Sequence, residues 1–110
     1  MPNELTTKTC EPCTGGIAPL SAEAAANMMA ELHEGWENTG TTLVRRLEFK
    51  GFAKAVYHAN VAAYLGDAEG HHPDIRFGWG YCEVEFTTHD AGGLTQNDFI
   101  CAAKFDRLLG

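Results

Sequence analysis

The sequence predicts a two-layer α+β domain in which helices cover one face of an antiparallel four-stranded sheet. Apolar residues recur at helical spacing in three segments and alternate with polar residues in four shorter ones. These segments follow the order helix-strand-strand-helix-strand-strand-helix, and short turns between successive strands favour antiparallel pairing. The chain has 110 residues, 45% of them hydrophobic, which is enough for one modest core.

The N-terminal part divides into an arm and the start of the domain. Residues 1–19 are rich in Thr, Pro and Gly and are expected to form a flexible N-terminal arm. The domain is expected to occupy residues 20–110. Its first helix should begin at Ser21, which can cap it, with Glu23 in the first turn and Gly35 as the stop.

The middle of the chain predicts two strands and a helix. A short strand is expected at Trp36-Glu37, and a longer one over residues 42–49. A second helix is expected over residues 52–65, ended by Gly66 and Gly70. Its buried stripe, taken from helical spacing, consists of Phe52, Val56, Ala59 and Ala63.

The C-terminal part predicts a second pair of strands and a last helix. Alternation places strands over residues 75–79 and 82–88, and a capping-box pattern over residues 94–98 opens the helix. The apolar residues of this helix occupy more than one side: Phe99, Ile100, Ala102, Ala103, Phe105, Leu108 and Leu109. We interpret the second apolar side as a subunit contact.

Charge and hydropathy exclude several classes of partner. Eight basic and fifteen acidic side chains give a formal charge of −7, which argues against binding to nucleic acid or to an anionic membrane. Arg45 and Arg46 are adjacent and are interpreted as a solvated strand face. No apolar run approaches the roughly 20 residues of a membrane span, and the first residues do not resemble a signal peptide. We therefore expect a cytoplasmic protein.

The four cysteines are a C-x-x-C pair, Cys10 and Cys13, and two isolated residues. A four-cysteine zinc site would show two such pairs, and a thioredoxin-like pair would lie between a strand and a helix. Neither pattern is present around Cys10 and Cys13, so the pair is interpreted first as part of the flexible arm. Metal binding and redox chemistry stay open as alternatives for it. Cys82 and Cys101 are expected to be small core residues.

Titratable side chains gather at element ends. His71 and His72 follow the second helix, His89 ends the fourth predicted strand, and Asp98 opens the last helix. Imidazoles with an ordinary pKa of about 6.5 are suited to proton transfer near neutral pH. The same side chains are zinc-compatible, so a metal site is an alternative. Simple capping of helix ends is another.

In these residues the chain resembles the pterin-4α-carbinolamine dehydratase family. The resemblance is carried by Asp67, His71-His72-Pro73, Trp79, His89 and Asp98 at matching spacing, and it covers nearly the whole domain. It implies an enzyme without cofactor or metal that removes water from a 4a-hydroxy-tetrahydropterin to give the quinonoid dihydropterin. This substrate is left behind by aromatic amino acid hydroxylases. The resemblance also implies a homodimer or homotetramer.

By position, the pterin is expected to lie between two segments. One is His71-His72-Pro73, and the other is Thr88-His89-Asp90, whose main chain could meet the amide-like edge of the pterin.

The family resemblance also implies roles for individual side chains. His71 and His89 are expected to exchange protons with the leaving oxygen and the ring nitrogen, in an order that stays open. His72 is expected to orient the substrate. Asp98 is expected to hold an imidazole in its useful tautomer and to favour its charged form. Capping is the rival role for Asp98.

A non-enzymatic role is the alternative function. One animal member of the resembled family also binds a homeodomain transcription factor, so the chain could be a partner-binding module with a vestigial pocket. The apolar last helix is its cue, although self-association explains that helix equally well.

Overall fold

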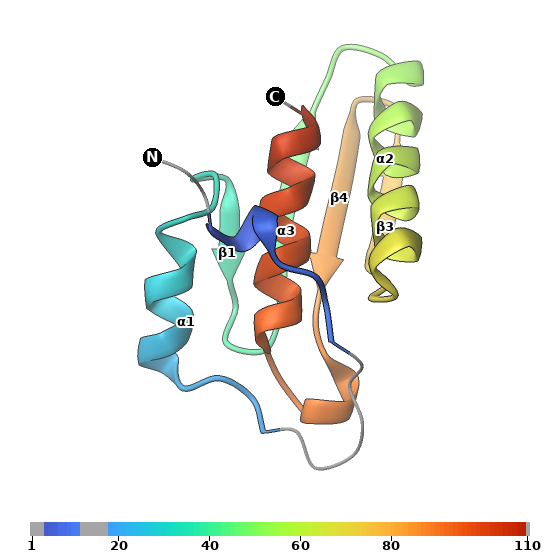
Figure 1. Ribbon diagram of the computed structural model, residues 1–110. Coiled ribbons are helices and arrows are strands. Elements are labelled where there is room, and N and C mark those ends of the chain that lie inside the picture. Colours follow the sequence, from blue (N-terminus) through green and yellow to red (C-terminus); the bar gives the residue numbers. More distant parts are fainter. Residues whose placement is uncertain (1–3, 12–17, 110) are drawn as a thin grey trace.

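A four-stranded antiparallel sheet forms one layer of the protein and the helices form the other (Figure 1). The structure is a computed structural model that describes residues 4–11 and 18–109. The elements in chain order are η1 (Glu4–Thr7), α1 (Ala22–Met29), β1 (Trp36–Asn38), β2 (Leu43–Glu48), α2 (Ala53–Glu69), β3 (Asp74–Gly78), β4 (Tyr81–Phe86), η2 (His89–Ala91) and α3 (Gln96–Leu109). The predicted fold class and the predicted order of elements are confirmed.

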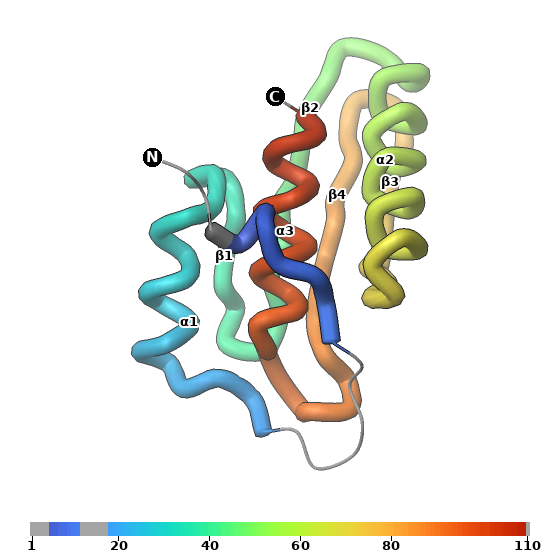
Figure 2. The backbone as a smooth tube through the Cα atoms, viewed as in Figure 1, coloured from blue at the N-terminus to red at the C-terminus, as the bar shows by residue number. Residues whose placement is uncertain are grey.

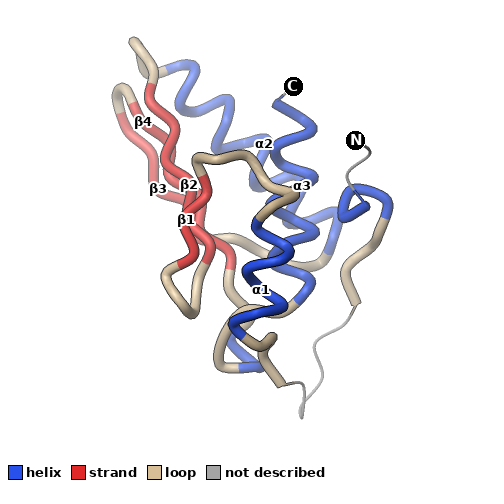
Figure 3. The backbone as a smooth tube through the Cα atoms, turned by 90° about the vertical axis from the view of Figure 1, so that its left-hand side faces the viewer, coloured by secondary structure: helices blue, strands red, loops and turns tan. Residues whose placement is uncertain are grey.

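The sheet has the strand order β1-β2-β4-β3. In Figure 3, α1, α2 and α3 all lie on the same side of it. The strand β4 alternates as expected, and Cys82, Val84 and Phe86 are fully buried beneath the helices. Its intervening residues face the uncovered side, where Glu83 pairs with Arg76 of the neighbouring strand at 2.6 Å.

The helix α3 is enclosed within the chain. It packs against α2 and the two central strands, and the segment that contains η1 crosses its other side (Figure 2). Leu5 of that segment is only 2% exposed. The second apolar side of α3 is therefore covered by residues 4–11, which belong to the predicted arm. This contact inside the chain accounts for the second apolar side except at Leu108, which is 54% exposed, and the number of subunits stays a prediction.

The helix α2 differs from the expectation in its end and in its buried face. It continues through Gly66 to Glu69, and its buried residues are Ala55, Ala59, Ala62, Leu65 and Gly66. Only Ala59 of the predicted stripe is buried, and Phe52 is 51% exposed. Because many residues of this helix are small alanines, spacing alone did not identify the side that faces the sheet.

Arg45 corrects the expectation of a solvated face on β2. Its side chain is buried on the helix side of the sheet, with Nη1 2.6 Å from Oδ1 of Asp106. The same carboxylate accepts hydrogen bonds from Nε1 of Trp36 at 2.8 Å and from the N–H of His33 at 2.9 Å. Arg46, on the opposite face, is exposed as expected.

The remaining expectations concern the membrane and the cysteines. Within residues 4–11 and 18–109, no helix combines the length and the apolar character that crossing a membrane requires. Cys82 and Cys101 are fully buried, which confirms them as core residues. Cys10 is partly buried, while Cys13 lies outside the described residues.

Candidate active site

A pocket of about 360 Å³ opens where α2 ends and where β4 leads into η2. The residues that line it are Glu11, Gly70, His71, His72, Thr87, Thr88, His89 and Asp90. Its volume lies in the range of about 300–1,000 Å³ that small-molecule sites occupy. The pocket brings together five of the residues singled out in the sequence: His71, His72, Thr88, His89 and Asp90.

A sharp exit from α2 places the two adjacent histidines. Gly70 closes the helix at φ +67°, a left-handed conformation that suits glycine. The N–H of His71 then donates to the carbonyl of Gly66 at 3.0 Å. A Cβ on Gly66 would collide with Cδ of Pro73, so this glycine lets the returning chain lie directly on the helix. Gly66 is therefore a close-approach residue, and its interpretation as a helix breaker was wrong.

Asp98 lies beneath the pocket and is fully buried. Its Oδ1 is 2.5 Å from Nε2 of His71. Its Oδ2 accepts hydrogen bonds from the hydroxyl of Thr88 at 2.8 Å and from the N–H of Thr95 at 2.9 Å. The bond to Thr95 is the backward half of a capping box. One carboxylate thus both caps α3 and holds an imidazole, so the two roles left open for Asp98 are compatible.

The contact with Asp98 determines which nitrogen of His71 can meet a ligand. An ionised carboxylate only accepts hydrogen bonds, so we assign the hydrogen to Nε2 of His71. Nδ1 is then the nitrogen available for proton exchange. The ring is also held by Phe86, which stacks on it with a centroid distance of 6.3 Å and an interplanar angle of 10°. His71 is therefore a ring with a fixed orientation.

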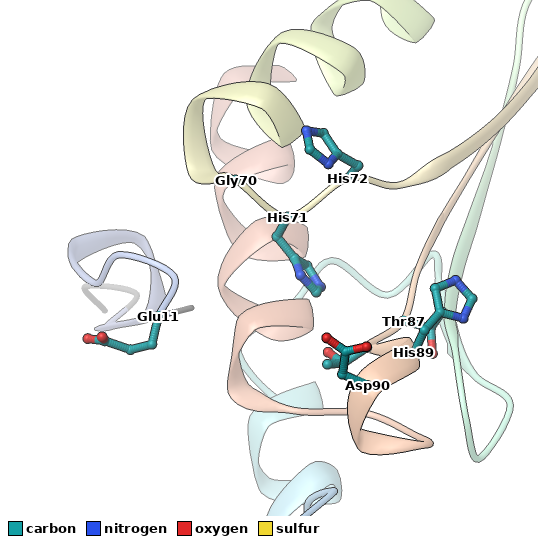
Figure 4. A pocket seen from close by; sticks show the side chains of 8 residues that line it. Glu11, Gly70, His71, His72, Thr87, His89 and Asp90 are labelled. Carbon is teal, nitrogen blue, oxygen red and sulfur yellow. The ribbon is translucent and has the colours of Figure 1, made fainter. Parts of the chain in front are cut away.

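The other two imidazoles of the pocket are more exposed. The side chain of His72 is 68% exposed, and its 3.6 Å contact with the exposed carboxylate of Asp67 is a weak surface pair. His89 begins η2 and is also exposed. Figure 4 shows the His71 ring directed toward η2, while the rings of His72 and His89 are turned away from the His71 ring. The pocket therefore combines one anchored imidazole with two that are exposed to solvent.

The segment Thr88-His89-Asp90 does not form the strand end that was expected for it. The strand β4 stops at Phe86, and residues 89–91 form the short helix η2. The N–H and the carbonyl of Thr88 both pair with Gly93, at 3.3 and 3.4 Å. Main-chain contact with a pterin edge at Thr88 would have to compete with this pairing.

Some predicted residues lie outside the pocket lining. Pro73 packs on α2, and Asp98 supports His71 from below. Trp79 is 71% exposed in the turn between β3 and β4, at the other end of these strands. Within residues 4–11 and 18–109, no three or more His, Cys, Asp or Glu side chains are grouped so that they could hold a metal ion.

Glu11, Gly70 and Thr87 are pocket residues that the sequence reasoning missed. Glu11 reaches the pocket because its main chain is clamped by Asn97, whose Oδ1 accepts from the N–H of Glu11 at 3.0 Å and whose Nδ2 donates to its carbonyl at 2.7 Å. No local pattern in the arm signals this contact. A local signal was available for Gly70, because a glycine at the end of a helical pattern marks the point where the chain leaves the helix.

Comparisons with known proteins agree on one family. The family profile described as Pterin 4 alpha carbinolamine dehydratase matches residues 18–108. A protein of Methylococcus capsulatus, named as an assumed pterin-4-alpha-carbinolamine dehydratase, is 50% identical over 106 residues, covering 94% of this chain and 92% of that protein.

Two solved structures are similar in fold. A transcriptional coactivator/pterin dehydratase from Brucella melitensis has a TM-score of 0.75 at 24% identity, covering 84% of this chain and 99% of that one. A pterin dehydratase-like protein described as a RuBisCO assembly factor in the alpha-carboxysome has a TM-score of 0.58 at 26% identity, covering 71% of this chain and 93% of that one.

Proposed function

Because this chain belongs to the pterin-4-alpha-carbinolamine dehydratase family, we propose that it removes water from a 4a-hydroxy-tetrahydropterin to give the quinonoid dihydropterin. The observation that carries this proposal is the imidazole of His71, fixed by Asp98 beside a pocket that His72 and His89 also line. In the cytoplasm, such a reaction would return the pterin for recycling after aromatic amino acid hydroxylation.

The chemistry requires two proton movements. Hydroxide is a poor leaving group from a saturated ring carbon, so the leaving oxygen must be protonated. The neighbouring ring nitrogen must lose its proton as the double bond forms. Each positioned acid or base typically contributes about 100- to 10,000-fold to the rate. Histidine suits both tasks because its ordinary pKa of about 6.5 makes both protonation states accessible.

The pocket offers a division of these tasks. His71, held through Nε2, presents Nδ1 for one proton transfer, and His89 from η2 performs the other on the opposite side of the bound ring. His72 binds and orients the substrate. Asp98 is a positioning residue, because it acts through the tautomer of His71. The exposed rings of His72 and His89 would turn inward when a ligand displaces water.

A stopped-flow measurement of carbinolamine decay tests the proposal. The wild-type protein should accelerate the decay, and His71→Ala and His89→Ala should each lose about 100- to 10,000-fold of that acceleration. His33→Ala is the matched control, since this exposed histidine lies outside the pocket lining. If the wild-type protein leaves the decay rate unchanged, the chain is not this enzyme.

Partner binding is the second candidate function, favoured by an exposed apolar surface on the outer side of α2. Tyr57 and Tyr64 are 61% and 71% exposed, and together with Leu108 at the end of α3 they border a shallow depression. A second copy of the chain is the occupant that the expected homo-oligomer would supply. Two measurements separate the roles. If the chain is a dehydratase, stopped-flow kinetics should show that His71→Ala loses turnover. If the surface on α2 is a subunit contact, light scattering should show that Tyr64→Glu loses the association of the wild-type protein.

A further inference from the structure

Two thiols meet where the N-terminal segment crosses α3. Sγ of Cys10 lies 3.5 Å from Sγ of Cys101, although the two residues are 91 positions apart in the chain. The sulfur atoms of a disulfide are about 2.05 Å apart, so a relative movement of about 1.5 Å would join these two. Both are free thiols in the structure.

Several hydrogen bonds hold Cys10 in this place. Its N–H donates to Oε1 of Glu69 at 3.0 Å, and Oε2 of Glu69 accepts from Lys104 at 2.7 Å. The next residue, Glu11, is clamped by Asn97 as described above. The two thiols therefore face each other because the segment is docked by side chains of α2 and α3.

The thiol pair also adjoins the pocket. Sγ of Cys101 lies 4.0 Å from the main-chain carbonyl oxygen of His71, and Glu11, next to Cys10, lines the pocket wall. A covalent bond between the thiols would fix this wall to the helix that carries Asp98.

We propose that Cys10 and Cys101 are the two partners of a reversible disulfide, formed with hydrogen peroxide, that locks residues 4–11 onto α3. The thiol of Cys10 first attacks the peroxide, which gives a sulfenic acid and one water. The sulfur of Cys101 then attacks the sulfenic sulfur; its proton leaves with the displaced hydroxide as a second water. Two thiols are oxidised and one peroxide is reduced, so the step balances.

Accessibility selects Cys10 as the first thiol to react. Cys10 is partly exposed, whereas Cys82 and Cys101 are fully buried. The hydrogen bond with the Cys10 thiol, together with burial, raises the pKa of Cys101, and burial raises the pKa of Cys82. Burial therefore keeps peroxide in solution away from both thiols, whereas a sulfenic acid on Cys10 would form next to Cys101, whose sulfur is only 3.5 Å away.

The test uses the full chain carrying Cys13→Ser, which removes the neighbouring thiol of the C-x-x-C pair. After peroxide treatment, the protein should lose two mass units, and a digest should contain a peptide that joins Cys10 to Cys101. In denaturant the oxidised protein should take up one alkyl group instead of three, because only Cys82 stays free. Dithiothreitol should restore all three thiols.

Thermal unfolding gives a readout that is independent of the proposed activity. Cross-linking positions so far apart restricts the unfolded chain, so the midpoint should rise by about 5 °C or more upon oxidation. Cys10→Ser in the same background is the matched control, because the site is partly exposed and the variant should fold; its midpoint should not respond to peroxide. Oxidation of Cys10 to a sulfinic acid without a cross-link would overturn the proposal. So would a wild-type product that joins only Cys10 to Cys13.

Discussion

Replacing Asp98 by Asn changes the hydrogen bonding of the site with almost no change in shape. The carboxylate accepts from His71 on one oxygen and from Thr88 and Thr95 on the other. An asparagine amide accepts on one side only. We expect its oxygen to face the two donors Thr88 and Thr95, which leaves its NH₂ group facing Nε2 of His71.

The size of the effect follows from this reversal. Nε2 of His71 must then accept a hydrogen bond, so the neutral ring carries its hydrogen on Nδ1 and can no longer accept a proton there. We expect kcat to fall by about 100- to 10,000-fold, a range whose upper end is the loss caused by the same substitution in a serine protease triad. Loss of charge-assisted hydrogen bonding should cost about 1–3 kcal/mol of unfolding free energy.

Three measurements separate positioning from folding. Stopped-flow kinetics gives kcat, thermal unfolding gives the stability, and the ¹⁵N chemical shifts of the His71 ring report which nitrogen carries the hydrogen. Asp67→Asn is the matched control, because this carboxylate is 88% exposed and contacts His72 rather than His71. The control should retain the wild-type kcat and the wild-type tautomer.

Two results would each refute one step of the reasoning. If folded Asp98→Asn protein kept the wild-type kcat while its His71 tautomer was reversed, the tautomer would be irrelevant to turnover. If the tautomer itself were unchanged, the assignment of the Nε2 hydrogen would be wrong.

Three further outcomes concern stability. Gly66→Ala should lower the free energy of unfolding by about 1–3 kcal/mol, because the new methyl group meets the ring of Pro73. Gly70→Ala should lower it by only about 1 kcal/mol, because the new methyl group meets no atom and only the left-handed backbone conformation is strained. Urea unfolding compares the two variants. Asp106→Asn should cost about 2–4 kcal/mol in the same assay, since three donors share this carboxylate. Burial tends to raise the pKa of Glu69, but its lysine partner and the N–H of the docked segment lower it overall. The contribution of the Glu69 carboxylate to the free energy of unfolding should therefore be complete above about pH 4.3 and should be lost as the pH falls through the lower pKa of the folded state. Urea unfolding from about pH 6 to about pH 3 should show this loss in the wild-type protein, and Glu69→Gln should abolish it.

Patterns confined to one element were predictable from the sequence. The alternation of β4 identified its buried face because a strand repeats every two residues. The cap at Ser21 was predictable because its hydroxyl accepts from the N–H of Ala24, three residues on. The convergence of His71 and Asp98 required the family resemblance, since they are 27 positions apart and no local pattern links them.

Features that depend on contacts between elements were missed. Arg45 appears as an interruption in an apolar strand, and only its pairing with Asp106 explains its burial. Glu11 belongs to a segment without periodicity, and it reaches the pocket through side chains of two helices. Gly66 was taken for a breaker because a mid-helix glycine looks the same in sequence whether it ends a helix or admits a neighbouring ring.

The enclosure of α3 has a consequence for how the protein is prepared. Leu5 covers part of the helix in the native chain, so a shortened version that begins after residue 11 would leave an apolar stripe open to water. Two shortened chains could hide these stripes against each other and form a dimer through a surface that residues 4–11 cover in the longer chain. The subunit number should therefore be measured on protein that retains its first residues.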